Sequence, residues 1–249
     1  MQQTRPELHS GETLEDLQCG GLMLIQKKDG FRFGTDAVLL ADFAKRVHSK
    51  NTLDLCTGTG IVPILLAAKS DTQHICGIEI QHDVADAAQR SVTLNGLDSR
   101  ISIQCGDLKN ALSFYPCASF DLVTCNPPYM KSGCAILNDS DNKIISRHEV
   151  LCTLDDITEV SSKLLKHGGH LVMVHRPNRL ADVMCSMRKK RIEPKYIRFV
   201  HASFEKPPVL FLTDGMLGAN SEIKILPPLL LYDKEGHETP ELKSIYGRE

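Results

Sequence analysis

The chain contains no tryptophan and carries little net charge. Its 249 residues have a formal net charge of −2 at pH 7. The broad positive excess that would mark a general nucleic-acid binder is therefore absent, although a local basic patch is compatible with this total. With 42% hydrophobic and 24% charged residues, the composition is that of an ordinary globular protein, long enough to bury the core of one large α/β domain.

Long apolar runs and paired cysteines are also missing. No apolar stretch approaches the ~20 residues that a membrane-spanning helix needs, and the first ten residues lack the pattern of a signal peptide. The nine cysteines are an odd number and never form a Cys-x-x-Cys pair, which argues against a disulfide framework and against a zinc site. We therefore expect a cytoplasmic protein without a bound metal.

A strand, a glycine-rich turn and a helix follow one another after residue 51. They are Thr52–Cys56, Thr57-Gly58-Thr59-Gly60 and Ile61–Lys69. The two glycines let a ligand approach the backbone, and the start of the helix offers free N–H donors. Pro63 stands where a dinucleotide fingerprint has its third glycine, which argues against a pyrophosphate ligand and for a nucleoside such as S-adenosylmethionine.

Polar side chains end the predicted parallel strands. Glu79 closes the strand His74–Glu79 at the spacing expected for a group that binds ribose hydroxyls. Asp107 follows the strand Ile101–Cys105 and is suited to the adenine of the cofactor, or to capping the next helix. Because parallel strands bring their carboxyl ends to one edge of a sheet, these groups are expected together with Asp54, Gly58, Gly60 and Asn126.

The run Asn126-Pro127-Pro128-Tyr129 follows the apolar strand Phe120–Cys125. Proline fixes its own φ and restricts the residue before it, so Asn126 and Pro127 are held in one conformation. The Asn126 side-chain oxygen and the Pro127 carbonyl accept hydrogen bonds from a planar amine, and Tyr129 supplies a ring for stacking. The run predicts a site that methylates an amino group, with an ordinary strand-ending turn as the alternative.

Three further segments are candidates for substrate binding. Phe33 lies in Phe31–Asp36, which is either a lip over a ligand pocket or the core of a hairpin with a helix cap. The polar segment 130–146 has the length of a lid. Residues 176–198 hold eight basic and two acidic side chains, a local charge of +6, and form the candidate phosphate-contacting patch. Its proposed contacts are Arg176, Arg179, Arg188, Lys189 and Lys190.

The element order predicts an α/β fold with a mostly parallel seven-stranded sheet, helices on both faces and an antiparallel C-terminal edge. Residues 1–50 are expected as an extension of a short strand, a turn and a helix, packed on a core of residues 51–249 within a single domain. The first 18 residues are expected to be loose or helical.

Together the glycine motif, Glu79, Asp107 and Asn126–Tyr129 resemble the class I, Rossmann-like S-adenosylmethionine-dependent methyltransferases that modify amino groups. Phe31–Leu40, Ile225–Leu229 and Tyr246-Gly247 resemble the bacterial valine-tRNA adenine-N6 methyltransferases, a likeness that spans residues 22–247. The resemblance implies methylation of the N6 amine of adenosine 37 in the tRNA anticodon loop. The sequence does not determine the oligomeric state, and a monomer is assumed. The resemblance also implies catalytic roles for Asn126, Pro127 and Tyr129. The implied cofactor ligands are Asp54, Gly58, Gly60, Glu79, Asp107 and Asn126.

Other acceptors and other classes remain open. The same motif suits adenine in DNA or ribosomal RNA, or the glutamine amide of a release factor. The glutamine enzymes would be expected to carry a helical domain before the glycine motif, where this chain has about fifty residues. A non-catalytic cofactor- or RNA-binding module and a nicotinamide dehydrogenase are further alternatives; the intact Asn126–Tyr129 run disfavours the first and Pro63 the second.

Overall fold

The structure is a computed structural model that describes residues 8–28, 34–127 and 152–248. The predicted roles of Phe33 and Tyr129 and the segment 130–146 lie outside the described residues.

A mixed sheet of nine strands forms the centre of the molecule. Its strand order is β10-β8-β9-β7-β6-β3-β4-β5, with β11 also paired to β8. The parallel half holds the apolar runs expected from the sequence. Helices cover both of its faces, the central strands β3 and β6 are buried, and the edge strand β5 is partly exposed. The strands are β3 (Asn51–Leu55), β4 (His74–Glu79), β5 (Ile101–Cys105), β6 (Phe120–Cys125), β7 (Leu165–His175), β8 (Ile192–His201), β9 (Pro208–Leu217), β10 (Lys224–Ile225) and β11 (Leu229–Leu230).

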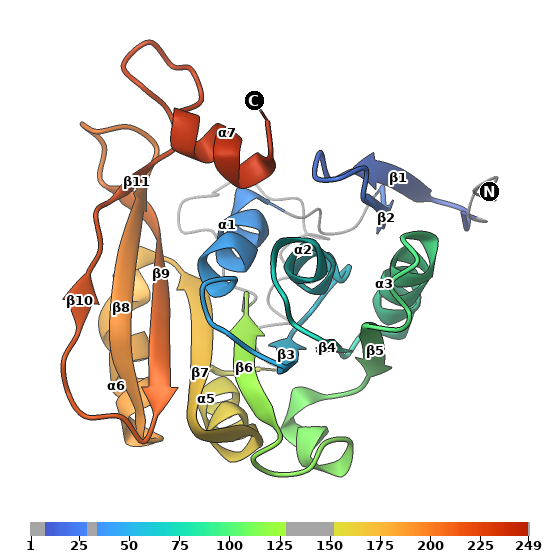
Figure 1. Ribbon diagram of the computed structural model, residues 1–249, viewed down its shortest axis with the longest axis horizontal. Helices are drawn as coiled ribbons and strands as arrows, with labels where there is room; N and C mark the ends of the chain where they lie inside the picture. Colours follow the sequence, from blue (N-terminus) through green and yellow to red (C-terminus); the bar gives the residue numbers. More distant parts are fainter. Residues whose placement is uncertain (1–7, 29–33, 128–151, 249) are drawn as a thin grey trace, which may run out of the picture.

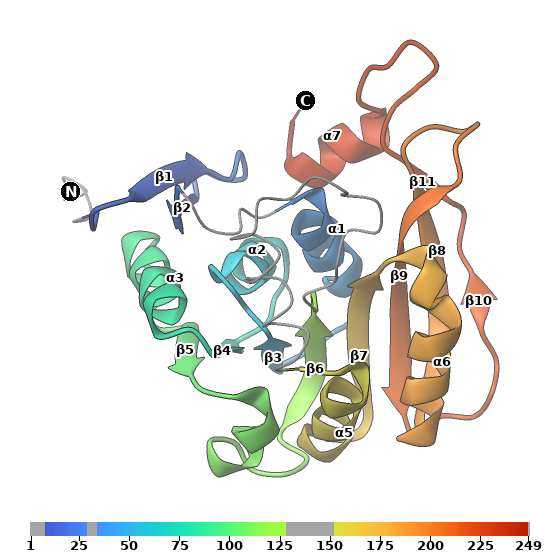
Figure 2. The same cartoon turned by 180° about the vertical axis from the view of Figure 1, so that it is seen from behind.

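Helices cover both faces of this sheet, as Figures 1 and 2 show from opposite sides. One face carries α1 (Thr35–Ala44), α2 (Ile61–Lys69) and α3 (His82–Leu94), and the other carries α5 (Leu154–Leu164) and α6 (Leu180–Lys189). Each layer encloses its own cluster of buried apolar side chains. Two short 3₁₀ segments, η1 (Leu108–Ser113) and η2 (Pro177–Arg179), follow β5 and β7.

The first described residues form a hairpin rather than a loose or helical lead-in. Strands β1 (Glu12–Asp16) and β2 (Met23–Lys27) pair antiparallel as a separate two-stranded sheet. Leu17 and Leu24 attach the hairpin to the core that contains α1 and α2. The hairpin and the last helix, α7 (Pro240–Tyr246), lie at the end of the main sheet toward which β6 points (Figure 1).

The α/β class and the mostly parallel sheet are confirmed, with one difference in the antiparallel part. Seven long strands make up the sheet as expected, and β10 and β11 add two short parallel pairs on β8. The antiparallel strand β9 lies between β7 and β8 instead of at the edge. A hairpin joins β8 to β9, so β8 again runs parallel to β6 and β7. Among the described helices, none has the length and apolarity to span a lipid bilayer.

Candidate functional site

The glycine turn and Glu79 form one hydrogen-bonded unit at the carboxyl ends of β3 and β4. One Glu79 carboxylate oxygen accepts the Gly58 N–H at 3.0 Å, and the other accepts the Gln81 N–H at 2.9 Å. Gly58 and Gly60 both have positive φ, at 55° and 80°, so the turn depends on glycine. Among the described residues other than its chain neighbours, no heavy atom lies within 4 Å of a Cβ built on Gly58, which leaves room for a ligand to approach the backbone there.

Asp54 lies beneath this turn, in the middle of the sheet. Its side chain is 1% exposed and accepts a hydrogen bond of 2.6 Å from the Thr124 hydroxyl of β6. Burial raises the pKa of Asp54 from 3.8 to about 7, the Thr124 hydrogen bond opposes this rise, and the charge of Glu79 adds to it. A carboxyl group that changes charge near neutral pH therefore joins the strand of the glycine turn to the strand of Asn126.

Asp107 caps the segment that follows β5. Its carboxylate accepts the Lys109 N–H at 2.9 Å at the start of η1, and the Lys109 ammonium lies 3.5 Å from its other oxygen. The capping role that the sequence allowed is thus observed. Because the Gly106 N–H donates to the Glu79 carbonyl at 2.8 Å, Asp107 is held close to the end of β4. Its predicted contact with the cofactor adenine is untested.

Asn126 and Pro127 follow the last residue of β6, where parallel pairing places Cys125 opposite Leu55 of β3. Pro127 is buried and Asn126 is partly buried. The Asn126 Oδ1 atom is shielded from solvent and has no hydrogen-bond partner among the described residues. A buried amide oxygen without a donor is uncommon in folded proteins and indicates a position prepared for a ligand that carries one.

Two features at the carboxyl ends of these strands were not predicted from the sequence. Cys56 adopts a left-handed φ of 56°, a conformation that non-glycine residues take at a cost and that clusters at functional sites. Its thiol interacts with the thiols of Cys125 and Cys152, so three cysteines from separate segments meet beside the site. His175 ends β7 and accepts the Arg176 N–H at its Nδ1 at 2.8 Å. Burial and the nearby arginines lower its pKa to about 4, so it stays neutral at pH 7.

The predicted basic run is divided between two ends of the sheet. Arg176 and Arg179 follow β7 at the same edge as Asn126. The Arg176 guanidinium donates to the Val209 carbonyl at 3.3 Å, and Arg179 pairs with Asp182 at 2.6 Å. Helix α6 then leads away from this edge, because β8 begins at the opposite one. Arg188, Lys189 and Lys190 therefore lie apart from the first two, and Arg188 and Lys190 form ion pairs with Glu193 and Glu159.

Two other polar features lie away from these residues. A hollow of about 410 Å³ lies between the C-terminal ends of α1 and α2, and none of the predicted site residues lines it. Within the described ranges, the one group of three possible metal ligands is Asp233, Glu235 and His237. It forms a turn in which Asp233 accepts the N–H groups of the other two at 2.9 Å.

Comparison with known proteins gives relatives that cover most of this chain. A tRNA1(Val) (adenine(37)-N6)-methyltransferase from Porphyromonas gingivalis is 28% identical over 220 residues, which is 84% of this chain and 85% of the relative. A protein of the same name from Parabacteroides distasonis is 27% identical over 190 residues, covering 75% and 77% of the two chains.

Solved structures agree on the fold. A predicted O-methyltransferase from Agrobacterium tumefaciens has a TM-score of 0.70 at 21% identity, covering 85% of this chain and 95% of the other. The 16S rRNA N2 G1207 methyltransferase of T. thermophilus, in complex with AdoMet and guanosine, has a TM-score of 0.58 at 17% identity, covering 85% and 52%. The family model described as "Methyltransferase small domain" matches residues 27–190, and the chain belongs to that family.

Proposed function

We propose that this protein transfers a methyl group from S-adenosylmethionine to the N6 amine of adenosine 37 in a valine tRNA. The observation that carries the proposal is the buried, unpartnered Asn126 Oδ1, held at the carboxyl end of β6 beside the strand of the glycine turn. An oxygen in this position accepts an N–H from an amine brought to the site. The names of the curated relatives supply the tRNA and the position in it.

The described residues fit S-adenosylmethionine as the cofactor. Gly58 leaves open space above the turn, and Glu79 closes β4 with a carboxylate that is 6% exposed and can accept ribose hydroxyls. Asp107 lies next to it, at the end of β5, where the adenine of the cofactor would be bound. The bound cofactor supplies a methyl group on a sulfonium centre, and its lack of a pyrophosphate agrees with Pro63 in the first turn of α2.

Catalysis rests on positioning the amine. An exocyclic adenine amine is a poor nucleophile, because its lone pair is delocalised into the ring. The Asn126 oxygen and the Pro127 carbonyl accept its two N–H groups, which favours the pyramidal amine and directs its lone pair at the methyl group. His175 at the end of the neighbouring strand is neutral at pH 7, because its pKa is lowered to about 4. The methylated amine then loses a proton to solvent, and no dedicated base is required.

The anticodon loop is a suitable substrate because its bases are unpaired. Such a base turns into a pocket at small energetic cost. Arg176 and Arg179 lie at the same edge of the sheet as Asn126. They are the two residues of the predicted basic run that we retain as phosphate contacts for an RNA loop bound at this edge. Arg188, Lys189 and Lys190 would reach RNA only if the tRNA stem extended around α6.

The test is the Asn126→Ala variant, measured with labelled S-adenosylmethionine and valine tRNA. We expect methyl transfer to fall about 100- to 1,000-fold, the scale of a lost transition-state contact, and cofactor affinity to change less than about fivefold. Asn220→Ala is the matched control, because Asn220 is exposed and lies near the start of β8, away from this edge. A large loss of cofactor binding in Asn126→Ala would contradict the role assigned to Asn126.

The acceptor itself is tested with separate pools of tRNA, ribosomal RNA and release factor. Label in tRNA that maps to methyladenosine next to the valine anticodon supports both the chemistry and the substrate. Label confined to ribosomal RNA or protein would retain the methyltransferase and reject the tRNA. Cofactor binding without label in any pool would favour a non-catalytic module.

A further inference from the structure

Gln26 of β2 has a side chain whose amide is buried without hydrogen bonds. The residue is 1% exposed, and neither its Nε2 nor its Oε1 atom has a partner among the described residues. Both ends of one buried amide are thus unsatisfied, whereas at least about nine in ten buried polar groups in proteins are bonded. Since the desolvation of such a group destabilises the ligand-free fold, the amide indicates a function that depends on a bound partner.

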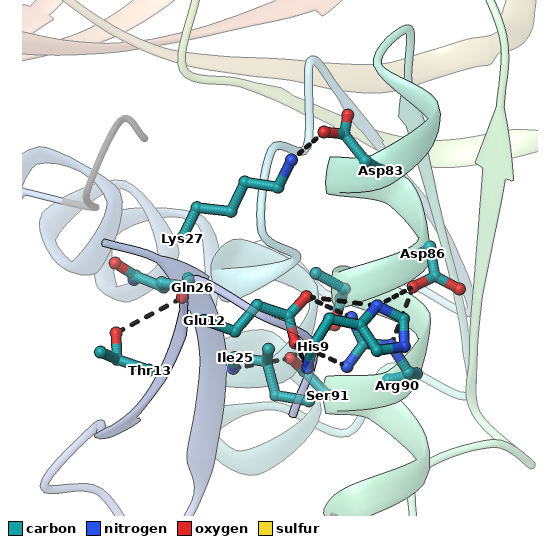
Figure 3. A network of polar contacts seen from close by, with 11 residues as sticks. His9, Glu12, Thr13, Ile25, Gln26, Lys27, Asp83, Asp86, Arg90 and Ser91 are labelled. Carbon is teal, nitrogen blue, oxygen red and sulfur yellow. Dashed lines mark hydrogen bonds and ion pairs between the residues drawn. The ribbon is translucent and has the colours of Figure 1, made fainter. Parts of the chain in front are cut away.

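The backbone that carries Gln26 is fixed in place by contacts with α3 (Figure 3). The Ile25 N–H donates to the Ser91 hydroxyl at 2.9 Å, and Lys27 pairs with Asp83 in the first turn of the helix. On β1, the carboxylate of Glu12 pairs with Arg90 of α3 and accepts one of its N–H groups at 3.0 Å. The hairpin is therefore held on both of its strands, and the Gln26 amide stays unbonded although its neighbours are all satisfied.

The amide faces the apolar core that the hairpin shares with α1 and α2, on the part of β2 next to the first turn of α3. Side chains of alternate strand residues share a face, so Gln26 and Leu24 point the same way, and Leu24 packs in the cluster that contains Ile61 and Val62 of the first turn of α2. Strand β2 runs toward the first turn of α3, because Lys27 reaches Asp83 there. Figure 3 shows the Gln26 side chain directed away from α3.

Gln26 of the hairpin and Asn126 directly after β6 thus both carry buried polar atoms without a hydrogen bond among the described residues, and the Lys27–Asp83 pair places β2 next to the start of the helix that follows Glu79. A glutamine side chain can donate an N–H to a ring nitrogen of adenine, while the two N–H groups of the amine go to Asn126 and Pro127. We propose that Gln26 contacts the ring edge of the target adenine and determines specificity for that base. This inference rests on the proposed methyl transfer, with Asn126 as the acceptor for the amine and Gln26 as the reader of the ring.

The test compares Gln26→Met, which keeps the volume and removes the amide, with Gln73→Met, an exposed glutamine before β4. Without ligands, we expect Gln26→Met to melt about 3 °C or more above the wild type, because two unsatisfied polar atoms are removed. In the same variant kcat/KM for valine tRNA should fall about 10- to 100-fold, the scale of one lost base contact, with cofactor affinity unchanged. Gln73→Met should leave all three values at the wild-type level.

Three results would overturn the inference: a lower melting temperature in Gln26→Met, an unchanged kcat/KM for tRNA, or a loss of cofactor affinity that accounts for the loss of activity. A failure of the proposed function is recognised separately, as a wild-type protein that binds S-adenosylmethionine and methylates no tRNA. In that case the contact of Gln26 with adenine is tested by measuring how tightly the wild type and Gln26→Met bind an adenosine-containing anticodon stem-loop in the presence of S-adenosylhomocysteine. Equal binding to the wild type and Gln26→Met, or no binding to either, would reject the contact.

Discussion

Asp54→Asn should make the ligand-free protein more stable, and the gain should grow with pH. The carboxyl group of Asp54 is 1% exposed, and burial raises its pKa from 3.8 to about 7. Between these two values the folded protein holds a proton that the unfolded chain has released, so the stability of the wild type falls as the pH rises through this range. Above pH 7 both states are ionised and the full penalty is present.

The size of the effect follows from the shift. A change from 3.8 to about 7 corresponds to roughly 4 kcal/mol of destabilisation at pH 8, more than half of which develops between pH 5 and pH 8. Asparagine keeps the shape and the oxygen that accepts the Thr124 hydroxyl at 2.6 Å, and it cannot ionise. The free energy of unfolding of Asp54→Asn minus that of the wild type should therefore increase by ~2–3 kcal/mol over this range.

Urea unfolding at pH 5, 6, 7 and 8 measures this difference directly, because other titrating groups are common to both proteins and cancel. Thr52, also buried on β3, gives the control Thr52→Val, whose stability difference from the wild type should not depend on pH. A pH-independent difference for Asp54→Asn, or one that shrinks toward pH 8, would refute the account of Asp54 as a buried carboxyl destabilised by its charge.

Two further predictions concern the same edge. Gly58→Ala and Gly60→Ala should each lower the free energy of unfolding by about 1–2 kcal/mol, because both positions have a positive φ. Gly60→Ala should lose about 1 kcal/mol more, because its Cβ would lie 3.2 Å from the Cβ of Ala88, whereas the Cβ at Gly58 meets no described atom within 4 Å. Equal losses in urea unfolding would contradict this. At pH 8 iodoacetamide should label the exposed Cys105, Cys117 and Cys185 and spare Cys56, Cys125 and Cys152. A hydrogen bond from a neighbouring thiol raises the pKa of Cys56 and of Cys152, and burial raises the pKa of all three thiols. Peptide mass spectrometry distinguishes the two sets, and early labelling of Cys125 would show that the region opens readily.

The part of the fold that depends on local patterns could be predicted. The helix Ile61–Lys69 was expected and is observed with these bounds, because Gly60 in a left-handed conformation marks its start and the apolar residues are buried all round. The strand before Asn126 was equally predictable from its uniform apolar run and the prolines that stop it. Such features need only the preferences of neighbouring residues.

The features that depend on distant contacts were missed. Residues 12–16 read as a polar lead-in, and they form a strand because they pair with β2 and because Glu12 binds Arg90, 78 positions away. Gln26 was placed in a strand, but nothing local indicates that its amide faces the core. The basic run was predicted as one patch, although the ten residues of α6 span about 15 Å and separate its two ends.

Because β9 runs opposite to β7 and β8, the sequence of the loop between β8 and β9 can change independently of the strands β3 and β4. Since β8 ends at the same edge as β6, residues 202–207 form a hairpin turn on the rim beside Arg176, with Phe204 75% exposed. Hairpin turns tolerate changes of length and sequence that buried parallel strands do not. Changes in this turn would alter the rim without disturbing Asp54, Glu79 or the glycine turn, so the proposed cofactor site and the rim beside it are structurally separable.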